Sequence, residues 1–335
     1  MSPSTFAATD AAREVAAAER RIRATIRETL LQPSPALSTA TGADVFLKLE
    51  CLQVTGSFKA RGAFNKLLSL TPAQREAGVV TASTGNHALA VAHASALLGV
   101  ESEIFLPATV SESKLDALRS RQARLRLIDD DPGAVERIAR HEAEASGRAY
   151  VSPYNDPQVI GGQGTVAVEL RRQLERFDAV FVPVGGGGLG AGIAADLAAN
   201  RPDTRVIGCQ PAACPIMMES IRAGRLLELP SKPSVSDATL GTLEPDSVTF
   251  PLCRELVADW SCVAETDLRR ALRFVLERES LMVEGAAALP VAALLAASSR
   301  WRDARVVLVL SGAHIAMPLL AELAQENAPW QLPQA

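Results

Sequence analysis

One lysine of this chain stands where its amine could act as a nucleophile. Lys59 lies in the segment LQVTGSFKARGAF (52–64), after a small polar turn and at the start of a predicted helix. The positive end of the helix dipole and partial burial beside Phe58 and Phe64 both disfavour an ammonium ion. A lysine with a lowered pKa can form an imine with a carbonyl compound. Taken alone, however, a lysine on a helix is usually a solvated charge.

A run of glycines, Gly185 to Gly188, follows the apolar segment AVFVPV (179–184) and precedes a helix that begins near Leu189. Consecutive glycines let backbone N–H groups converge on an anion, and the helix N-terminus adds positive potential. The pattern predicts a phosphate cradle. It also fits the dinucleotide fingerprint, but that motif requires an acid after the next strand, where this chain has Gln210. A plain glycine turn is the other alternative.

A polar turn, STGNH (83–87), lies between the apolar strand GVVTAS (78–83) and a predicted helix over 88–99. Its polar groups would stand at the positive end of that helix, where a carboxylate binds well. Ordinary capping of the helix by a hydroxyl is an equally good explanation of the turn taken alone. The side chains concerned are Ser83, Thr84, Asn86 and His87.

A fourth candidate, Ser311, ends the segment ARVVLVLSG (304–312). The unbroken apolar run is typical of a central parallel strand that is buried on both faces. Because α/β proteins gather their site residues beyond the carboxyl ends of such strands, Ser311 is a candidate site residue. The alternative is a simple turn serine.

Strands alternate with helices along the whole chain, which predicts an α/β fold. Apolar residues make up 48% of the sequence but aromatic residues only 4%, so Ala, Leu and Val must build the core. A length of 335 residues allows two domains. We place a smaller domain at 53–147, inserted into a larger domain formed by 1–52 and 148–335.

Charge and cysteine content limit the partners and the location. The net charge of −4 provides no basic surplus for nucleic acid. The five cysteines form no CxxC pair, which favours a reduced, cytoplasmic setting. The longest apolar run, AAALPVAALLAA (286–297), is too short to span a bilayer and contains Pro290, and the N-terminal segment lacks the features of a signal peptide. We therefore expect neither a nucleic-acid nor a membrane partner.

Taken together, the ordered segments SFKARGA, STGNH, GGGGLG and VLSGAH resemble the pyridoxal-phosphate enzymes of fold type II, in particular the serine/threonine dehydratase and serine racemase branch. VSPYNDPQVIGGQGT and LMVEGAAA resemble two further segments of that family. The resemblance covers nearly the whole chain. It implies a tryptophan synthase β-like fold, with two three-layer α/β domains and twisted, mostly parallel sheets. The large domain would bind the cofactor and the small domain the substrate.

The resemblance also implies a role for each candidate residue. Lys59 would bind pyridoxal 5′-phosphate covalently and act as the base at Cα, with Phe58 beside it. Ser311 would face the pyridine nitrogen and Asn86 the 3-hydroxyl. The phosphate would bind to Gly185, Gly186, Gly187, Gly188 and Leu189, and the substrate carboxylate to Ser83, Thr84 and His87.

The activity that the resemblance implies is an ammonia-lyase (dehydratase) of amino acid catabolism. It would convert a β-hydroxy amino acid such as L-threonine or L-serine to a 2-oxo acid and ammonia by α,β-elimination. A hydroxyl facing the pyridine nitrogen suits elimination, because the departing β-hydroxyl takes the electrons. A racemase of serine or aspartate, a β-replacement synthase and a ligand-binding homologue without catalysis are the alternatives. The dehydratases of hydroxyectoine utilisation are the branch of similar length, and a symmetric dimer is the expected assembly.

Three positions depart from the family pattern. Thr84 occupies the place of the second serine of the racemases, which counts against racemisation because threonine is bulkier and stiffer. Gln210 stands where the family's divalent-cation site has a Glu, so we expect no metal. His314 replaces the final Asn of Ser-Gly-Gly-Asn and is either a polar group on the substrate side or a histidine packed behind the sheet.

Overall fold

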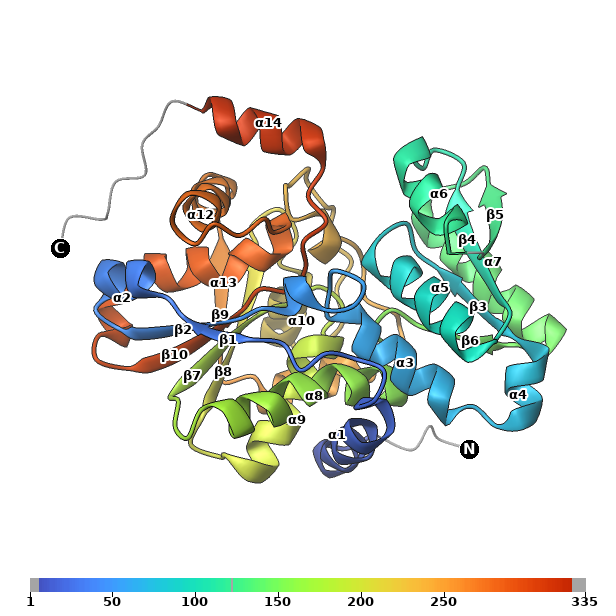
Figure 1. Cartoon of the computed structure of the whole chain (residues 1–335), viewed down its shortest axis with the longest axis horizontal. Coiled ribbons are helices and arrows are strands. Elements are labelled where there is room, and N and C mark those ends of the chain that lie inside the picture. The colour runs from blue at the N-terminus through green and yellow to red at the C-terminus, as the bar shows by residue number, and fades with distance from the viewer. Residues whose placement is uncertain (1–5, 122, 327–335) are drawn as a thin grey trace.

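The computed structural model describes residues 6–121 and 123–326, which form two neighbouring sheets with helices on their faces (Figure 1). The strands are β1 Leu31–Pro33, β2 Asp44–Lys48, β3 Val79–Ala82, β4 Ser102–Pro107, β5 Arg124–Ile128, β6 Ala149–Tyr150, β7 Ala179–Pro183, β8 Arg205–Pro211, β9 Asp259–Val263 and β10 Arg305–Val309. The α-helices are α1 Ala8–Ile22, α2 Pro35–Thr41, α3 Lys59–Ser69, α4 Pro72–Ala77, α5 Asn86–Leu98, α6 Glu112–Arg119, α7 Pro132–Ser146, α8 Pro157–Gln173, α9 Gly188–Asn200, α10 Ile216–Ala223, α11 Thr249–Leu256, α12 Glu265–Arg278, α13 Gly285–Ala296 and α14 Met317–Gln325. Short 3-10 helices lie at Glu50–Leu52, Asp237–Thr239 and Ser298–Trp301.

The larger sheet has six strands in the order β1-β2-β10-β7-β8-β9, and all neighbours are parallel except β1 and β2. Side chains alternate between its two faces, as the pleat of a strand requires. On β10, Val306 and Leu308 pack into the core beneath α12 and α13, whereas Val307 and Val309 pack into the core beneath α8 and α9. Both faces are buried, which explains the unbroken apolar run of this strand.

The smaller sheet has four parallel strands in the order β5-β4-β3-β6. On β4, Ile104 and Leu106 pack with α5 and α6, and Phe105 packs with α7 on the opposite face. Each sheet is therefore the middle layer of three, and the predicted α/β fold with mostly parallel sheets is confirmed.

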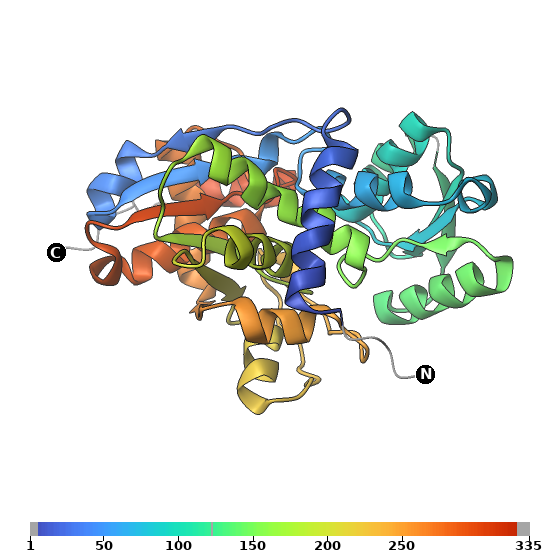
Figure 2. The ribbon, with the colours of Figure 1, turned by 90° about the horizontal axis from the view of Figure 1, so that it is seen from below.

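Helix α1 joins the two parts of the molecule from outside the sheets, and Figure 2 shows it lying across their junction. Its Ala11 belongs to the core of the larger sheet, and its Ile22 packs with Phe64 in the core next to the smaller one. The division of the chain at residues 53 and 147 stays a prediction. Just beyond residue 147, β6 pairs with β3 in the smaller sheet.

Two further observations concern membranes and thiols. Across residues 6–121 and 123–326, no helix is both long enough and apolar enough to cross a bilayer. All five cysteines lie in the described part of the chain and none of them is paired. Four are buried and Cys262 is exposed.

Candidate active site

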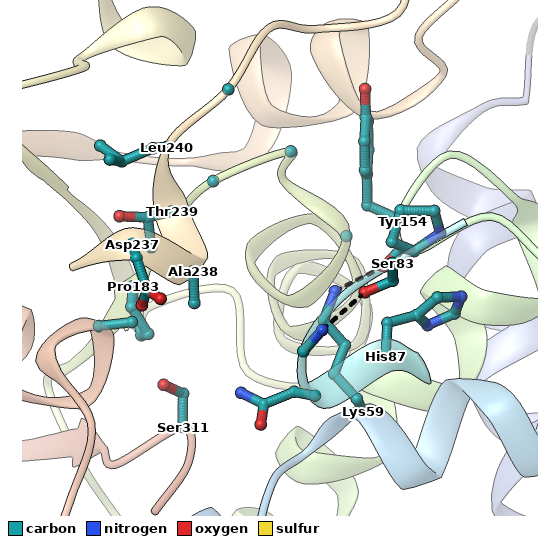
Figure 3. Close-up of a pocket in the computed structure, with 18 of the residues that line it drawn as sticks. Lys59, Ser83, His87, Tyr154, Pro183, Asp237, Ala238, Thr239, Leu240 and Ser311 are labelled. Carbon is teal, nitrogen blue, oxygen red and sulfur yellow. Dashed lines mark hydrogen bonds between the residues drawn. The ribbon is translucent and has the colours of Figure 1, made fainter. Parts of the chain in front are cut away.

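A cavity of about 420 Å³ opens between the two sheets, and every predicted site residue lines it. Figure 3 shows Lys59, Ser83 and His87 on one side of this pocket and Pro183, Asp237, Thr239 and Ser311 on the other. The predicted residues that the fold brings together here are Phe58, Lys59, Ser83, Thr84, Asn86, His87, Gly185, Gly186, Gly187, Gly188, Leu189 and Ser311. The cavity also contains His314 and Glu284.

Lys59 is the first residue of α3, and its side chain points into the cavity beside Phe58. Its Nζ donates a hydrogen bond to Pro153 O at 2.7 Å. Burial lowers the pKa of the amine to about 8, and the carboxylate of Glu284 partly opposes this effect. Near neutral pH, Lys59 therefore supplies more neutral amine than an exposed lysine would.

A buried network of charges fixes the helix that carries Lys59. Arg61, two residues along α3, bonds Glu50 through Nε and Glu169 through Nη1, both at 2.7 Å. Glu169 on α8 also accepts from Lys48 on β2 at 2.6 Å. All four side chains are fully buried, so each charge depends on its partners. The network ties α3 to α8 and to the end of β2.

The glycine loop joins β7 to the N-terminus of α9. Gly187 caps the helix with φ +91°, a left-handed conformation that glycine adopts easily. A Cβ on Gly186 would lie 2.4 Å from the ring of Tyr154, and one on Gly185 would lie 3.1 Å from Thr239. The loop therefore needs glycines partly because its neighbours approach closely. The amides of the first turn have no acceptor within the helix, and the loop lines the cavity, so they are available to an anion there.

The polar turn lies at the N-terminus of α5. Ser83 Oγ accepts a hydrogen bond from Gly85 N at 3.3 Å, so part of the turn is held by a local bond. His87 is 2% exposed, and burial together with the charge of Lys59 lowers its pKa to about 3. Its Nε2 lies 2.9 Å from Val151 O and must donate to it, so Nδ1 of the neutral ring carries no proton. His87 would donate to a carboxylate only with its proton moved to Nδ1.

Glu284 is a residue that the sequence reasoning missed. It directly precedes α13 and is 4% exposed. Its carboxylate accepts from Asn86 Nδ2 at 2.7 Å and from Ser311 Oγ at 3.3 Å. Burial raises its pKa to about 7, although the two hydrogen bonds and Lys59 favour its charge. The sequence did contain one sign of this residue: in LMVEGAAA, a single acid precedes an apolar helix. A carboxylate buried at such a position needs a hydrogen-bond or charge partner.

The loop after β8 and α10 supplies a further wall that local patterns did not predict. Residues 237–243 line the cavity, and Glu244 follows directly. Glu244 bonds Arg140 on α7 at 2.6 Å and Asn155 at 2.8 Å, and its amide donates to Tyr154 Oη at 2.8 Å. These bonds fasten the loop to α7 and to the segment before α8, which closes one side of the cavity.

Gln210 and His314 are two of the positions that depart from the family pattern, and the structure shows their contacts. Gln210 is fully buried, donates to Val184 O at 3.2 Å and accepts from Met218 N at 2.8 Å. Among the described residues, no group of three or more His, Cys, Asp or Glu side chains could hold a metal ion. His314 lines the cavity and lies 2.6 Å from Asn86 Oδ1, so it is not packed behind the sheet.

The residues present fit pyridoxal phosphate. The amine of Lys59 lies inside the cavity with a lowered pKa, as imine formation with an aldehyde requires. A cradle of glycines at the start of α9 suits a phosphate. Ser311, two residues after β10, and Asn86, which begins α5, are polar groups that also line the cavity and could bind the ring.

The α/β fold and this site define the class: the molecule is a pyridoxal-phosphate enzyme of fold type II. The chain belongs to the family described as "Pyridoxal-phosphate dependent enzyme", which it matches over residues 22–312. It is 36% identical over 302 residues to the L-threonine ammonia-lyase of Thermotoga maritima, covering 90% of this chain and 75% of that relative. The predicted family and cofactor are confirmed.

Solved structures give the same family. The chain is similar to a threonine deaminase from T.th., with a TM-score of 0.84 and 36% identity over 91% of this chain and 98% of that one. It is also similar to the serine racemase of maize, with a TM-score of 0.88 and 30% identity over 93% and 95% of the two chains.

Proposed function

We propose that this protein is an ammonia-lyase that converts a β-hydroxy amino acid, such as L-threonine or L-serine, to a 2-oxo acid and ammonia. One observation carries the proposal. A lysine amine, a phosphate-type glycine loop and the polar N-terminus of α5 all open into the same cavity. The relatives named threonine ammonia-lyase and threonine deaminase support the choice of substrate.

Residues of the chain would hold both the cofactor and the substrate. Lys59 would bind the aldehyde carbon, Gly185 to Leu189 the phosphate, Ser311 the pyridine nitrogen and Asn86 the 3-hydroxyl. When bound, the cofactor supplies an electron sink for the bond that breaks at Cα. The amides that begin α5, with Ser83 and Thr84, would hold the substrate carboxylate, since this end of the helix carries positive potential.

The amine of Lys59 would also act as the general base of the reaction. With the substrate bound, the neutral amine of Lys59 would take the Cα proton, which a pKa of about 8 permits near neutral pH. The β-hydroxyl would leave as water with a proton returned by the ammonium group of Lys59, and reaction of the released product with water would give the 2-oxo acid and ammonia. Arg140, Glu244 and Tyr154 hold the loop 237–243 against this side of the cavity and so limit the entry of water.

A racemase acting on serine or aspartate is the second candidate. The similarity to maize serine racemase favours it, and Thr84, which has a hydroxyl, lines the cavity. The stiffer Thr84 side chain counts against it. If the protein forms a D-amino acid from L-serine or L-aspartate and no 2-oxo acid, it is a racemase. If it binds the cofactor but forms neither product, it is a ligand-binding homologue without catalysis.

Several finer assignments belong to this proposal. We infer that the protein works in the cytoplasm, because its cysteines are unpaired. We also infer a homodimer, which is the commonest symmetric assembly. Residues 1–52 and 148–335 would form the cofactor-binding domain and 53–147 the substrate-binding domain. The branch that uses hydroxyectoine remains one setting for such a lyase.

The test compares the wild-type protein with Lys59→Ala. The wild type is expected to show a visible absorbance band of lysine-bound cofactor and to release a 2-oxo acid from threonine or serine. Lys59→Ala should lose the band, and the activity should fall by about three orders of magnitude or more, because the imine-forming amine and the proposed base are removed together. Lys66→Ala, on the same helix, is the control and should keep both. A band without oxo acid from any β-hydroxy amino acid would contradict the lyase assignment.

A further inference from the structure

Asn86 is held from two sides by residues that lie far from it in the sequence. Its Nδ2 lies 2.7 Å from Glu284 Oε2, and its Oδ1 lies 2.6 Å from His314 Nδ1. Glu284 directly precedes α13, and His314 follows β10. The amide that begins α5 of the small-sheet part is thus fixed by two segments of the large-sheet part.

The orientation of the amide and the position of one proton determine each other. Above its pKa of about 7, Glu284 is ionised and only accepts hydrogen bonds, so Asn86 must turn its NH₂ group toward it. Its carbonyl oxygen then faces His314, and this oxygen also only accepts. His314 must therefore carry its proton on Nδ1. In the other tautomer, a bare Nδ1 would face the bare oxygen of the amide.

Two glycines lie directly against the side chains that bond Asn86. A Cβ on Gly56, where φ is +74°, would lie 2.9 Å from His314 Cε1. A Cβ on Gly312 would lie 2.6 Å from Glu284 Oε1. Two glycines from separate segments thus provide the space for the imidazole and the carboxylate.

We propose that His314 is a positioning residue that acts through Asn86. Its Nδ1–H holds the carbonyl of the amide, which keeps both N–H groups of Asn86 turned toward Glu284 and the cavity. One N–H bonds Glu284, and the other would be available to the oxygen on the ring of a bound cofactor. The inference rests on the proposed function, in which Asn86 binds that oxygen.

The first test reads the tautomer directly. The chain has four histidines, so selective ¹⁵N labelling of histidine in the full-length protein gives few ring signals, and His314→Asn assigns one of them by its loss. With and without pyridoxal phosphate, the proton of His314 is expected on Nδ1 and that of His87 on Nε2. A neutral His314 protonated on Nε2 would overturn the proposal, because Asn86 would then be turned the other way.

The second test measures the dissociation constant of pyridoxal phosphate and the position of its visible band. His314→Phe keeps a ring without a donor, and His314→Asn places an amide N–H near the position of Nδ1. We expect about tenfold weaker binding for His314→Phe, the order of one lost hydrogen bond, and near wild-type binding for His314→Asn. His141→Phe, on the exposed face of α7, is the control.

Equal affinities for wild type and His314→Phe would overturn the proposal, and so would a His314→Asn variant as weak as His314→Phe. Oxo acid release is measured separately from binding. If the affinities follow the expected order but no β-hydroxy amino acid is converted, the proposed function fails and the role of His314 stands. If a β-hydroxy amino acid is converted but wild type and His314→Phe bind pyridoxal phosphate equally well, the proposed function stands and the role of His314 fails.

Discussion

At the scale of single residues, two buried groups of opposite charge, Lys59 and Glu284, determine the chemistry of the site. The low-dielectric surroundings lower the pKa of Lys59 and raise that of Glu284, and the attraction between the two groups limits both shifts. The negative charge of Asp237 raises the pKa of Glu284 further, and the charge of Lys59 lowers the pKa of His87. The reactivity of the amine thus depends on which of its neighbours is ionised.

This balance predicts how the cofactor is taken up at different pH values. Only the neutral amine attacks the aldehyde, so the rate of incorporation into cofactor-free protein should rise with pH and level off above about 8, the pKa of Lys59. Glu284→Gln removes the charge that stabilises the ammonium ion, so the midpoint should fall, by roughly one pH unit. The measurement is the appearance of the visible band after pyridoxal phosphate is added, from pH 6 to pH 10.

The control for this series is Glu255→Gln, an exposed position on α11. It should leave the midpoint unchanged. A midpoint that stays in place, or rises, in Glu284→Gln would mean that this carboxylate does not act on Lys59.

At the scale of elements, the position of α3 depends on the ionic network behind it. Arg61 on α3, Glu169 on α8 and Lys48 on β2 are fully buried, so the network is stable only while each charge is matched. Burial disfavours the charge of Glu169, but Arg61 and Lys48 outweigh it and hold the pKa of the carboxyl below its usual range.

Removal of this one carboxylate should destabilise the protein strongly. We expect Glu169→Gln to lower the free energy of unfolding by about 3–5 kcal/mol, since two buried cations lose a shared partner. Urea unfolding followed by circular dichroism measures the change. Glu175→Gln, at an exposed position just after α8, should change it by no more than about 0.5 kcal/mol. A loss below about 1 kcal/mol in Glu169→Gln would show that solvent or other groups compensate for the missing charge.

At the scale of the whole molecule, the apolar surface that the chain exposes suggests where a second copy would bind. Met282 is 54% exposed and Met317 is 70% exposed. Met282 lines an apolar groove with Leu272, Leu320 and Leu323, and Met317 begins the helix that carries the last two. Large apolar side chains at the surface are typical of interfaces.

Under the proposed homodimer, the variant Met282→Lys/Met317→Lys should weaken association by roughly a hundredfold or more, because two charges per subunit would be buried. Sedimentation velocity over a range of protein concentrations measures this effect. Leu97→Lys replaces a residue that is 61% exposed on α5 of the other part and should leave the dimer intact. A wild-type protein that sediments as a monomer would contradict the proposal itself.

Local signals in the sequence determined the fold class and the kind of chemistry. Runs of Val, Ile and Leu predicted the buried parallel strands, and the glycine run with its following helix predicted an anion site. Both are short-range patterns, because strand period and helix start are set by neighbouring residues. The placement of Lys59 at the start of α3 was readable for the same reason.

Only the tertiary structure decided which distant residues share the cavity. Glu284, Tyr154 and Asp237 come from three separate segments, and nothing in their local sequence records that they face Lys59. The sequence also left two positions open for His314, on the substrate side or behind the sheet, and only the folded structure places it at the cavity. The pKa values of Lys59 and Glu284 follow from their burial in the cavity, and burial is a property of the folded chain rather than of any one segment of it.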